Sequence, residues 1–224
     1  FSHGCITSVH PYIVMNFTDR LRDVMTLANV LGHGIHQYRS RGVGYLQCGT
    51  PLTTAEMASV FGEMLTFRRL QQVYDDPRTR LGLLCGKIED AFATVFRQVV
   101  LTRFEEVLHR ARREQGELAP ERICALWMEA NRPMHGDAVH LTDGYAWWWL
   151  YIGHFIRSPF YCYAYAFGEL LVLALYQKYQ EDGPTFVPRY LNLLASGGSD
   201  APDRLLERLG VDVTDPTFWD LGLN

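Results

Sequence analysis

The stretch LANVLGHGIHQ, residues 27–37, holds the side chains whose types and spacing most clearly suggest chemistry. On a helix, Asn29 and His33 lie four residues apart and share a face, as the two histidines of a His-Glu-x-x-His zinc motif do. Asn29 stands where that motif has its first histidine, and Val30 stands where it has its glutamate. Glu56 follows in TTAEMASVFGE, where a second helix packed antiparallel could bring its carboxylate beside His33.

These replacements affect the groups on which zinc chemistry depends. A catalytic zinc ion takes three protein ligands and leaves a fourth position for water. Asn29 offers only a neutral amide oxygen, which is a poor donor for zinc. Val30 cannot accept the proton of an attacking water, and general base catalysis is worth about 10² to 10⁴ in rate. We therefore expect no cofactor, with zinc bound only if the site is still metallated, and almost no hydrolysis.

Simpler roles remain open for the same side chains. Glu56 comes three residues after Thr53, which is the spacing of a capping box at a helix N-terminus, and this role can coexist with metal binding. A histidine such as His33, considered alone, is more often a satisfied core or surface residue than a ligand.

The apolar pattern predicts helices nearly everywhere. One short strand is expected in HPYIVMNF, residues 10–17, where apolar residues alternate. Thr18 is predicted to cap a first helix that stops near Gly42. Thr53 is predicted to cap a second helix, which ends before residues 75–77.

The remaining pattern is also helical. A long helix is expected over residues 81–113, and another over 121–131 that Pro133 with Gly136 ends. Residues 147–179 are apolar and aromatic, with a break expected at Pro159 and a buried helix after it. Short helices separated by Gly- and Pro-containing loops close the chain.

These elements predict an all-α fold with at most a short β element near residues 10–17. The chain has 224 residues, of which 48% are apolar, so it can bury a substantial core. No internal repeat or convincing domain boundary is visible, and we expect residues 1–224 to form a single domain. The opening FSHGC lacks a methionine and a signal-peptide pattern, which suggests that a removed or separate N-terminal portion precedes it.

Charge, hydropathy and cysteine spacing narrow the choice of partner and compartment. The net charge of −4 gives no broad basic surface, which disfavours nucleic acid and anionic membranes as partners. No apolar run reaches the roughly 18 residues that a membrane span needs, so we expect a soluble protein. The five cysteines are scattered and form no CxxC pair, which fits a reducing cytoplasm. The expected partner is a short peptide or another small molecule.

Four stretches together resemble the C-terminal catalytic half of oligoendopeptidase F, in the thimet oligopeptidase family of zinc peptidases. The likeness covers nearly the whole chain and implies a zincin-like, almost entirely helical catalytic domain whose zinc helices line a channel for short peptides. In the family an N-terminal helical region closes that channel, and this chain would lack it. The stretches are LANVLGHGIHQYRSR, TPLTTAEMASVFGEML, KIEDAFATVFRQVVLTRFEE and YIGHFIRSPFYCYAYAFGELL.

The resemblance assigns roles to individual residues. His33 matches the second histidine ligand and Glu56 the third ligand, with Glu63 as a neighbouring acid on the same helix. Asn29 and Val30 occupy the positions of the lost ligand and the lost general base. The resemblance also matches a later cluster, which in the family holds the substrate carbonyl and the developing oxyanion. It does not indicate which tyrosine faces the oxyanion. Its members here are His154, Tyr161, Tyr163 and Tyr165.

Three functions are compatible with this pattern. The first, which we favour, is a pseudopeptidase that binds peptides, or that regulates an active homologue or pairs with a separate N-terminal helical region, without cutting. The second is a working zinc oligopeptidase in which water, His36 or another side chain replaces the lost groups. The third is a repurposed, metal-free enzyme that uses His33, Glu56, His154 and a tyrosine for acid and base chemistry on another small substrate.

Overall fold

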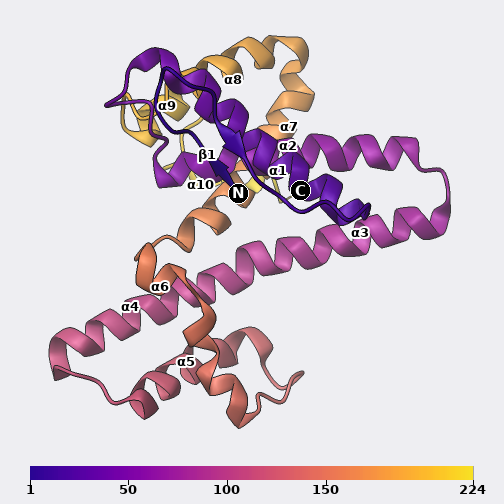
Figure 1. The fold of residues 1–224 in the computed structure, drawn as a ribbon. Coiled ribbons are helices and arrows are strands. Elements are labelled where there is room, and N and C mark those ends of the chain that lie inside the picture. The colour runs from indigo at the N-terminus through magenta and orange to yellow at the C-terminus, as the bar shows by residue number, and fades with distance from the viewer. Residues whose placement is uncertain (224) are drawn as a thin grey trace. The chain divides into compact units, whose positions relative to one another are not determined.

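The computed structural model describes residues 1–223, and most of them are helical (Figure 1). Within this range the only strands are β1 (Ser2–His3) and β2 (Tyr12–Ile13), which pair antiparallel with Ser2 opposite Ile13. The predicted all-α class, with a short β element inside residues 10–17, is confirmed. In chain order the α-helices are α1 (Leu21–Ser40), α2 (Leu52–Val73), α3 (Pro77–Phe92), α4 (Gln98–Gln115), α5 (Pro120–His135), α6 (His154–Arg157), α7 (Tyr163–Asp182), α8 (Phe186–Ala195), α9 (Pro202–Glu207) and α10 (Pro216–Asp220).

Tighter and wider helical turns connect some of these helices. A π-helical turn, Ala93–Arg97, lies between α3 and α4, and a 3-10 helix, Asp143–Tyr151, precedes α6. Shorter 3-10 turns occur at Arg41–Val43 and Gly183–Thr185. Among residues 1–223, no helix combines the length and the apolarity that crossing a membrane requires.

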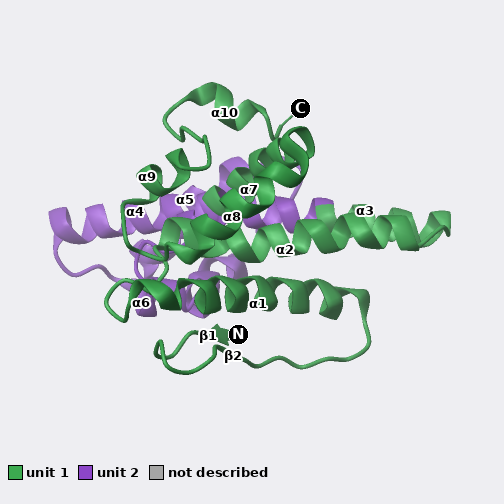
Figure 2. Cartoon of the chain, turned by 90° about the horizontal axis from the view of Figure 1, so that it is seen from above, with its two compact units in different colours: residues 1–87, 167–224 green, residues 88–166 purple. Residues whose placement is uncertain are grey.

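The chain divides into two compact units, coloured separately in Figure 2. Unit 1 comprises residues 1–87 and 167–224, and unit 2 comprises residues 88–166. The chain leaves unit 1 within α3 and returns to it within α7. The expected single domain over residues 1–224 stays a prediction.

Unit 1 has an apolar core built on α2, α7, α8 and the closing helices. Met57 of α2 and Leu171 of α7 are fully buried. The Phe61 ring of α2 stacks on Tyr190 of α8 with ring centroids 4.6 Å apart. Burying a large apolar side chain contributes about 1.5–3 kcal/mol, so this core fixes the position of α2 and of the polar residues on its other face.

Unit 2 has a smaller, aromatic core. Phe104 of α4 meets Trp127 of α5 edge to face, with ring centroids 5.1 Å apart. Phe155 of α6 lies 5.2 Å from Phe104 by the same measure. The indole N–H of Trp127 donates to the carbonyl of Tyr145 at 2.9 Å, which satisfies the one polar group of that side chain. This core holds α6 against α4 and α5.

The start of α1 differs from the prediction. Its N-cap is Arg20, not Thr18. The backbone N–H and the hydroxyl of Thr18 both donate to Asp23 Oδ2, each at 2.7 Å. The difference arises because Asp19 has a left-handed backbone, with φ 62°, which turns the chain once more before Leu21 begins the helix.

The start of α2 also differs, since Thr53 lies inside the helix and Pro51 is the N-cap. The Pro51 carbonyl accepts hydrogen bonds from the N–H groups of Thr54 and Ala55, at 3.0 and 2.9 Å. Proline has the φ of a helix entry fixed in advance, so it can begin the ladder before Thr53 is reached. The capping-box interpretation of Glu56 required Thr53 at the N-cap, and it loses that basis.

Two further boundaries were predicted wrongly. Of the two residues expected to end α5, Pro133 lies inside the helix, which continues past residue 131 to His135, and Gly136, where φ is 52°, is the one that caps it. A proline so near the C-terminus interrupts only the last turn, so the helix tolerates it. The helix expected over residues 81–113 already begins at Pro77 and contains the π-helical turn.

Candidate functional site

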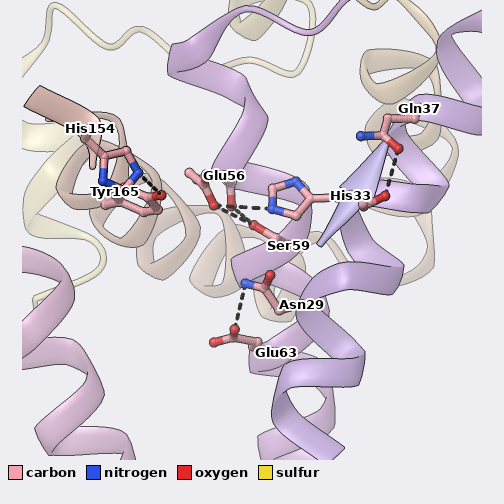
Figure 3. A network of polar contacts seen from close by, with 9 residues as sticks. Asn29, His33, Gln37, Glu56, Ser59, Glu63, His154 and Tyr165 are labelled. Carbon is pink, nitrogen blue, oxygen red and sulfur yellow. Dashed lines mark hydrogen bonds and ion pairs between the residues drawn. The ribbon is translucent and has the colours of Figure 1, made fainter. Parts of the chain in front are cut away.

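The residues predicted around a metal ion, here called the metal side, lie where α1 packs antiparallel to α2 (Figures 2 and 3). They are Asn29, Val30, His33 and Glu56. Gly32 allows the two backbones to approach closely, because a Cβ at this position would lie 2.7 Å from the Cα of Ser59. Real Cβ atoms essentially never come so close to another heavy atom. Asn29 and His33, on the neighbouring face of α1, consequently reach side chains of α2 directly.

His33 and Glu56 are brought together by this packing. His33 Nε2 lies 3.5 Å from Glu56 Oε2, and the two side chains are 22% and 6% exposed. The Ser59 hydroxyl donates to the same Glu56 oxygen at 3.1 Å. From α7, Gly168 packs against Glu56 so closely that a Cβ there would lie 2.8 Å from the Glu56 Cβ. Glu56 is therefore held on three sides, and its role as a ligand stays a prediction.

Asn29 is engaged with a different carboxylate. Its side-chain Nδ2 donates to Glu63 Oε1 at 2.8 Å (Figure 3). With the amide nitrogen used in this way, only the amide oxygen of Asn29 could contact a cation. Val30, the next residue, is buried and 4% exposed, and it has no polar atom in its side chain.

The side chains present do not fit a catalytic zinc ion. Such a site needs three ligands drawn from His, Cys, Asp and Glu. Between residues 1 and 223, no group of three or more of these side chains is arranged to hold a metal ion. His33 and Glu56 supply two ligands at most, and Asn29 adds a neutral amide oxygen of low zinc affinity.

His36, the replacement ligand considered from the sequence, lies in the protein interior. The residue is 2% exposed, and its Nδ1 has no hydrogen-bond partner in the described part of the chain. Burial, and secondly the charge of His33, lower the pKa of His36 to about 4. A buried imidazole of this kind is neutral at physiological pH, but it does not join His33 and Glu56 in a metal-binding group.

The residues predicted on the substrate side lie in and beside unit 2's α6. His154 Nε2 is 3.1 Å from the Tyr165 hydroxyl (Figure 3). The Tyr161 ring stacks on His154 with ring centroids 5.2 Å apart, and it lies 5.1 Å from the Tyr165 ring. Tyr163 is 38% exposed. The structure therefore groups His154, Tyr161 and Tyr165 as one aromatic cluster.

Several residues around these sites were not predicted from the sequence. Ser59 could have been found, since it lies three residues after Glu56 on a predicted helix and shares its face. Gly168 could not, because its role depends on where α7 crosses α2. The same holds for the buried ion pair between Lys87 and Glu169, whose charged atoms lie 2.9 Å apart although the residues are 82 positions apart.

Comparison with known proteins gives a family match over the whole chain. The family model described as Peptidase family M3 matches residues 1–224. Oligopeptidase PepF of Bacillus subtilis is 31% identical over 92% of this chain and 31% of its own length. An oligoendopeptidase F homologue of Borreliella burgdorferi is 30% identical over 91% of this chain and 35% of its own length.

A solved structure shows the same relationship. The crystal structure of oligoendopeptidase-F from Enterococcus faecium matches with a TM-score of 0.72 and 27% identity, over 89% of this chain and 36% of that one. The chain thus spans about a third of the length of the curated relatives it matches.

Proposed function

Because the chain belongs to peptidase family M3, we propose that it is an oligoendopeptidase-like domain that binds short peptides and has lost zinc-dependent hydrolysis. The names of its relatives describe them as oligopeptidases, which favours a short peptide as the ligand. Since the chain spans about a third of these relatives, the proposal concerns the binding and chemistry of this stretch alone.

The observation that carries the proposal is the state of Asn29 and Val30. Asn29 uses its amide as a donor to Glu63 at 2.8 Å, where zinc chemistry would need a histidine nitrogen facing the ion. Val30 is a buried aliphatic residue, and zinc-dependent hydrolysis would need a carboxylate at this position to deprotonate water. One change weakens the metal site and the other removes the general base, so each independently opposes hydrolysis.

The peptide-binding part of the proposal is supported by the cluster around His154. An imidazole N–H and tyrosine hydroxyls are donors that suit a peptide carbonyl or a developing oxyanion. His154 and Tyr165 are within hydrogen-bond distance of each other, so each limits the orientation of the other. A site that keeps these donors can bind a peptide backbone without a metal ion.

The test is the zinc content of the purified chain, measured by elemental mass spectrometry beside the double variant Asn29→His/Val30→Glu. We expect no zinc in the unaltered chain and about one zinc per molecule in the double variant. Cleavage of a quenched fluorescent peptide should appear only in the double variant, and a chelator should abolish it. A fluorescein-labelled octapeptide rich in Phe and Leu should bind the unaltered chain in a polarisation titration.

The control is the double variant with His33→Ala added, which should lose the zinc again if the ion sits between α1 and α2. One zinc per molecule in the unaltered chain, or chelator-sensitive cleavage by it, would show an active peptidase with a non-standard site. A double variant that binds no zinc would show that α1 and α2 do not retain a metal-site scaffold. Failure of the octapeptide to bind would remove the peptide-binding part of the proposal.

A further inference from the structure

The loop between α6 and α7 contains a strained residue directly before Tyr161. Phe160 has φ 58°, in the left-handed region. This conformation costs a residue other than glycine about 1–2 kcal/mol, and it persists only where neighbouring contacts hold it. Because Phe160 is adjacent to Tyr161 in the chain, whatever holds this backbone also decides where the Tyr161 ring lies.

Glu105 of α4 provides such a contact. Its Oε1 accepts the backbone N–H of Phe160 at 2.7 Å, which is short for a hydrogen bond to nitrogen and typical of a charge-assisted one. Glu105 is 1% exposed, and its other oxygen is buried with no hydrogen-bond partner in the described part of the chain. A buried carboxylate is unfavourable unless its contacts compensate for lost hydration. The bond to Phe160 is therefore a substantial part of what keeps Glu105 in this place.

A second contact from α4 reaches the same residue. The His109 ring, one helical turn after Glu105, lies 4.7 Å from the Phe160 ring between centroids. α4 thus holds both the backbone and the side chain of Phe160. Beyond it, the Tyr161 N–H donates to the Ser158 carbonyl at 3.2 Å, which closes the turn that leads into α7.

We propose that Glu105 is a positioning residue, which holds the Phe160 N–H and so presets the cluster of His154, Tyr161 and Tyr165 for ligand binding. The inference rests on the proposed function, since it gives that cluster a peptide-binding role. Glu105 acts through the loop and does not itself touch the peptide. A loop that is ordered in advance does not have to be ordered when the peptide binds, so affinity is higher.

Three variants separate the hydrogen bond from other effects. Glu105→Gln keeps an acceptor oxygen but removes the charge, whereas Glu105→Leu removes the acceptor at similar volume. Glu106→Gln is the matched control, because Glu106 is the next residue of α4, has a 48% exposed side chain and pairs with Arg110 at 2.8 Å.

Two readouts are measured on the full chain. The first is the NMR signal of the His154 ring, assigned with His154→Gln, which reports the cluster even without a ligand. The second is the Kd of the fluorescein-labelled octapeptide rich in Phe and Leu. We expect Glu105→Leu to shift or broaden the His154 signal and to raise the Kd at least about fivefold, as loss of a hydrogen bond to a charged group implies. Glu105→Gln, which keeps an acceptor oxygen without the charge, should raise the Kd less than Glu105→Leu does, and Glu106→Gln should leave it within about twofold.

The outcomes distinguish this inference from the proposed function. An unmoved His154 signal and an unchanged Kd in Glu105→Leu would overturn the positioning role and leave peptide binding intact. Equal losses in Glu105→Gln and Glu105→Leu would also overturn it, because the acceptor would then not be the group that matters. If the octapeptide binds no variant but the His154 signal moves in Glu105→Leu alone, the positioning role stands and the proposed function fails.

If Glu105→Leu does not fold, the positioning role of Glu105 can still be tested on the unaltered chain. Hydrogen exchange of the Phe160 amide in the unaltered chain reports directly on its bond to Glu105. Slow exchange, comparable with that of amides inside α4, supports the inference. Exchange as fast as that of an exposed loop amide contradicts it.

Discussion

The metal-side residues on α1 and α2 and the substrate-side cluster around His154 contrast in how much of their expected chemistry remains. On the metal side, Asn29 and Val30 stand where we propose that a ligand and a base have been lost, and the Asn29 amide donates to Glu63 at 2.8 Å. On the substrate side, the resemblance predicts a ligand-binding role for His154, Tyr161 and Tyr165, and the rings of the two tyrosines contact His154.

The difference teaches that scaffold and chemistry are separable in this fold. The approach of α1 to α2 depends on Gly32 and on the apolar core behind α2, neither of which involves the two replaced positions. The half-buried Asn29 donates its amide N–H to Glu63, so these two polar side chains satisfy each other in part between the helices. Under the proposed function, the zinc site would have lost its activity while the helices that carry its residues stayed packed.

The largest effect is expected from the single variants Asn29→His and Val30→Glu. They test whether these two side chains alone account for the proposed loss of chemistry on the metal side. Asn29→His alone should raise zinc affinity by more than about 100-fold, because even partners outside the first coordination shell change it by 10- to 100-fold. Val30→Glu alone should give neither zinc binding nor cleavage. Competition with a zinc-chelating dye measures the affinity.

Asn29→His is compared with the double variant Asn29→His/Val30→Glu. The rate of peptide cleavage should be about 10² to 10⁴ higher in the double variant, because only that variant has the general base. Peptide cleavage by Val30→Glu alone would contradict the proposal that Asn29 prevents zinc chemistry, because the site would then work without a histidine at position 29.

An intermediate effect is expected from pH, because the metal-side helix α1 buries His36. The pKa of His36 is lowered to about 4 by burial in the folded chain, against 6.5 as its ordinary value. As pH falls from 6.5 towards 4 the unfolded chain takes up a proton that the folded chain does not, so the free energy of unfolding falls. At about 1.4 kcal/mol per pKa unit, the loss approaches about 3 kcal/mol.

Urea unfolding at several pH values between 7 and 4 measures this loss. His36→Met removes the titrating group at similar size and should flatten the dependence in that range, whereas His140→Ala, at an exposed position, should leave it unchanged. The pKa values of Asp23, Asp76, Asp200 and Asp212 are lowered from 3.8 by hydrogen bonds, so these groups reduce the free energy of unfolding mainly below about pH 4 and equally in His36→Met. A steep fall that persists in His36→Met would locate the sensitivity elsewhere.

The sequence was sufficient for the fold class and for which residues share a helix face. Helical spacing of apolar residues placed Asn29 and His33 on one face, and turn residues located most loops within a few positions. The errors came from local backbone choices that residue types alone do not determine, such as the left-handed Asp19 before α1 and the entry to α2 at Pro51.

The partners of the site residues could be predicted only in part. The pair of His33 with Glu56 was expected from the resemblance, but the bond from Asn29 to Glu63 depends on the exact register of α1 against α2. The burial of Glu105 could have been found, because it lies four residues after the apolar Leu101 on one face of α4, but its bond to the Phe160 N–H depends on the path of the α6–α7 loop.

The smallest effect expected tests whether the aromatic cluster binds ligand or only packs. Tyr165→Phe removes the hydroxyl that lies 3.1 Å from His154 Nε2 and keeps the ring. We expect the Kd of the fluorescein-labelled octapeptide to rise about two- to fivefold, since one neutral hydrogen bond contributes about 0.5–1 kcal/mol. Tyr74→Phe, at a position 37% exposed and outside the cluster, is the control and should leave the Kd unchanged. If Tyr165→Phe lowers the free energy of unfolding but leaves the Kd unaltered, the cluster is packing, and the contrast between the two regions is one of structure alone.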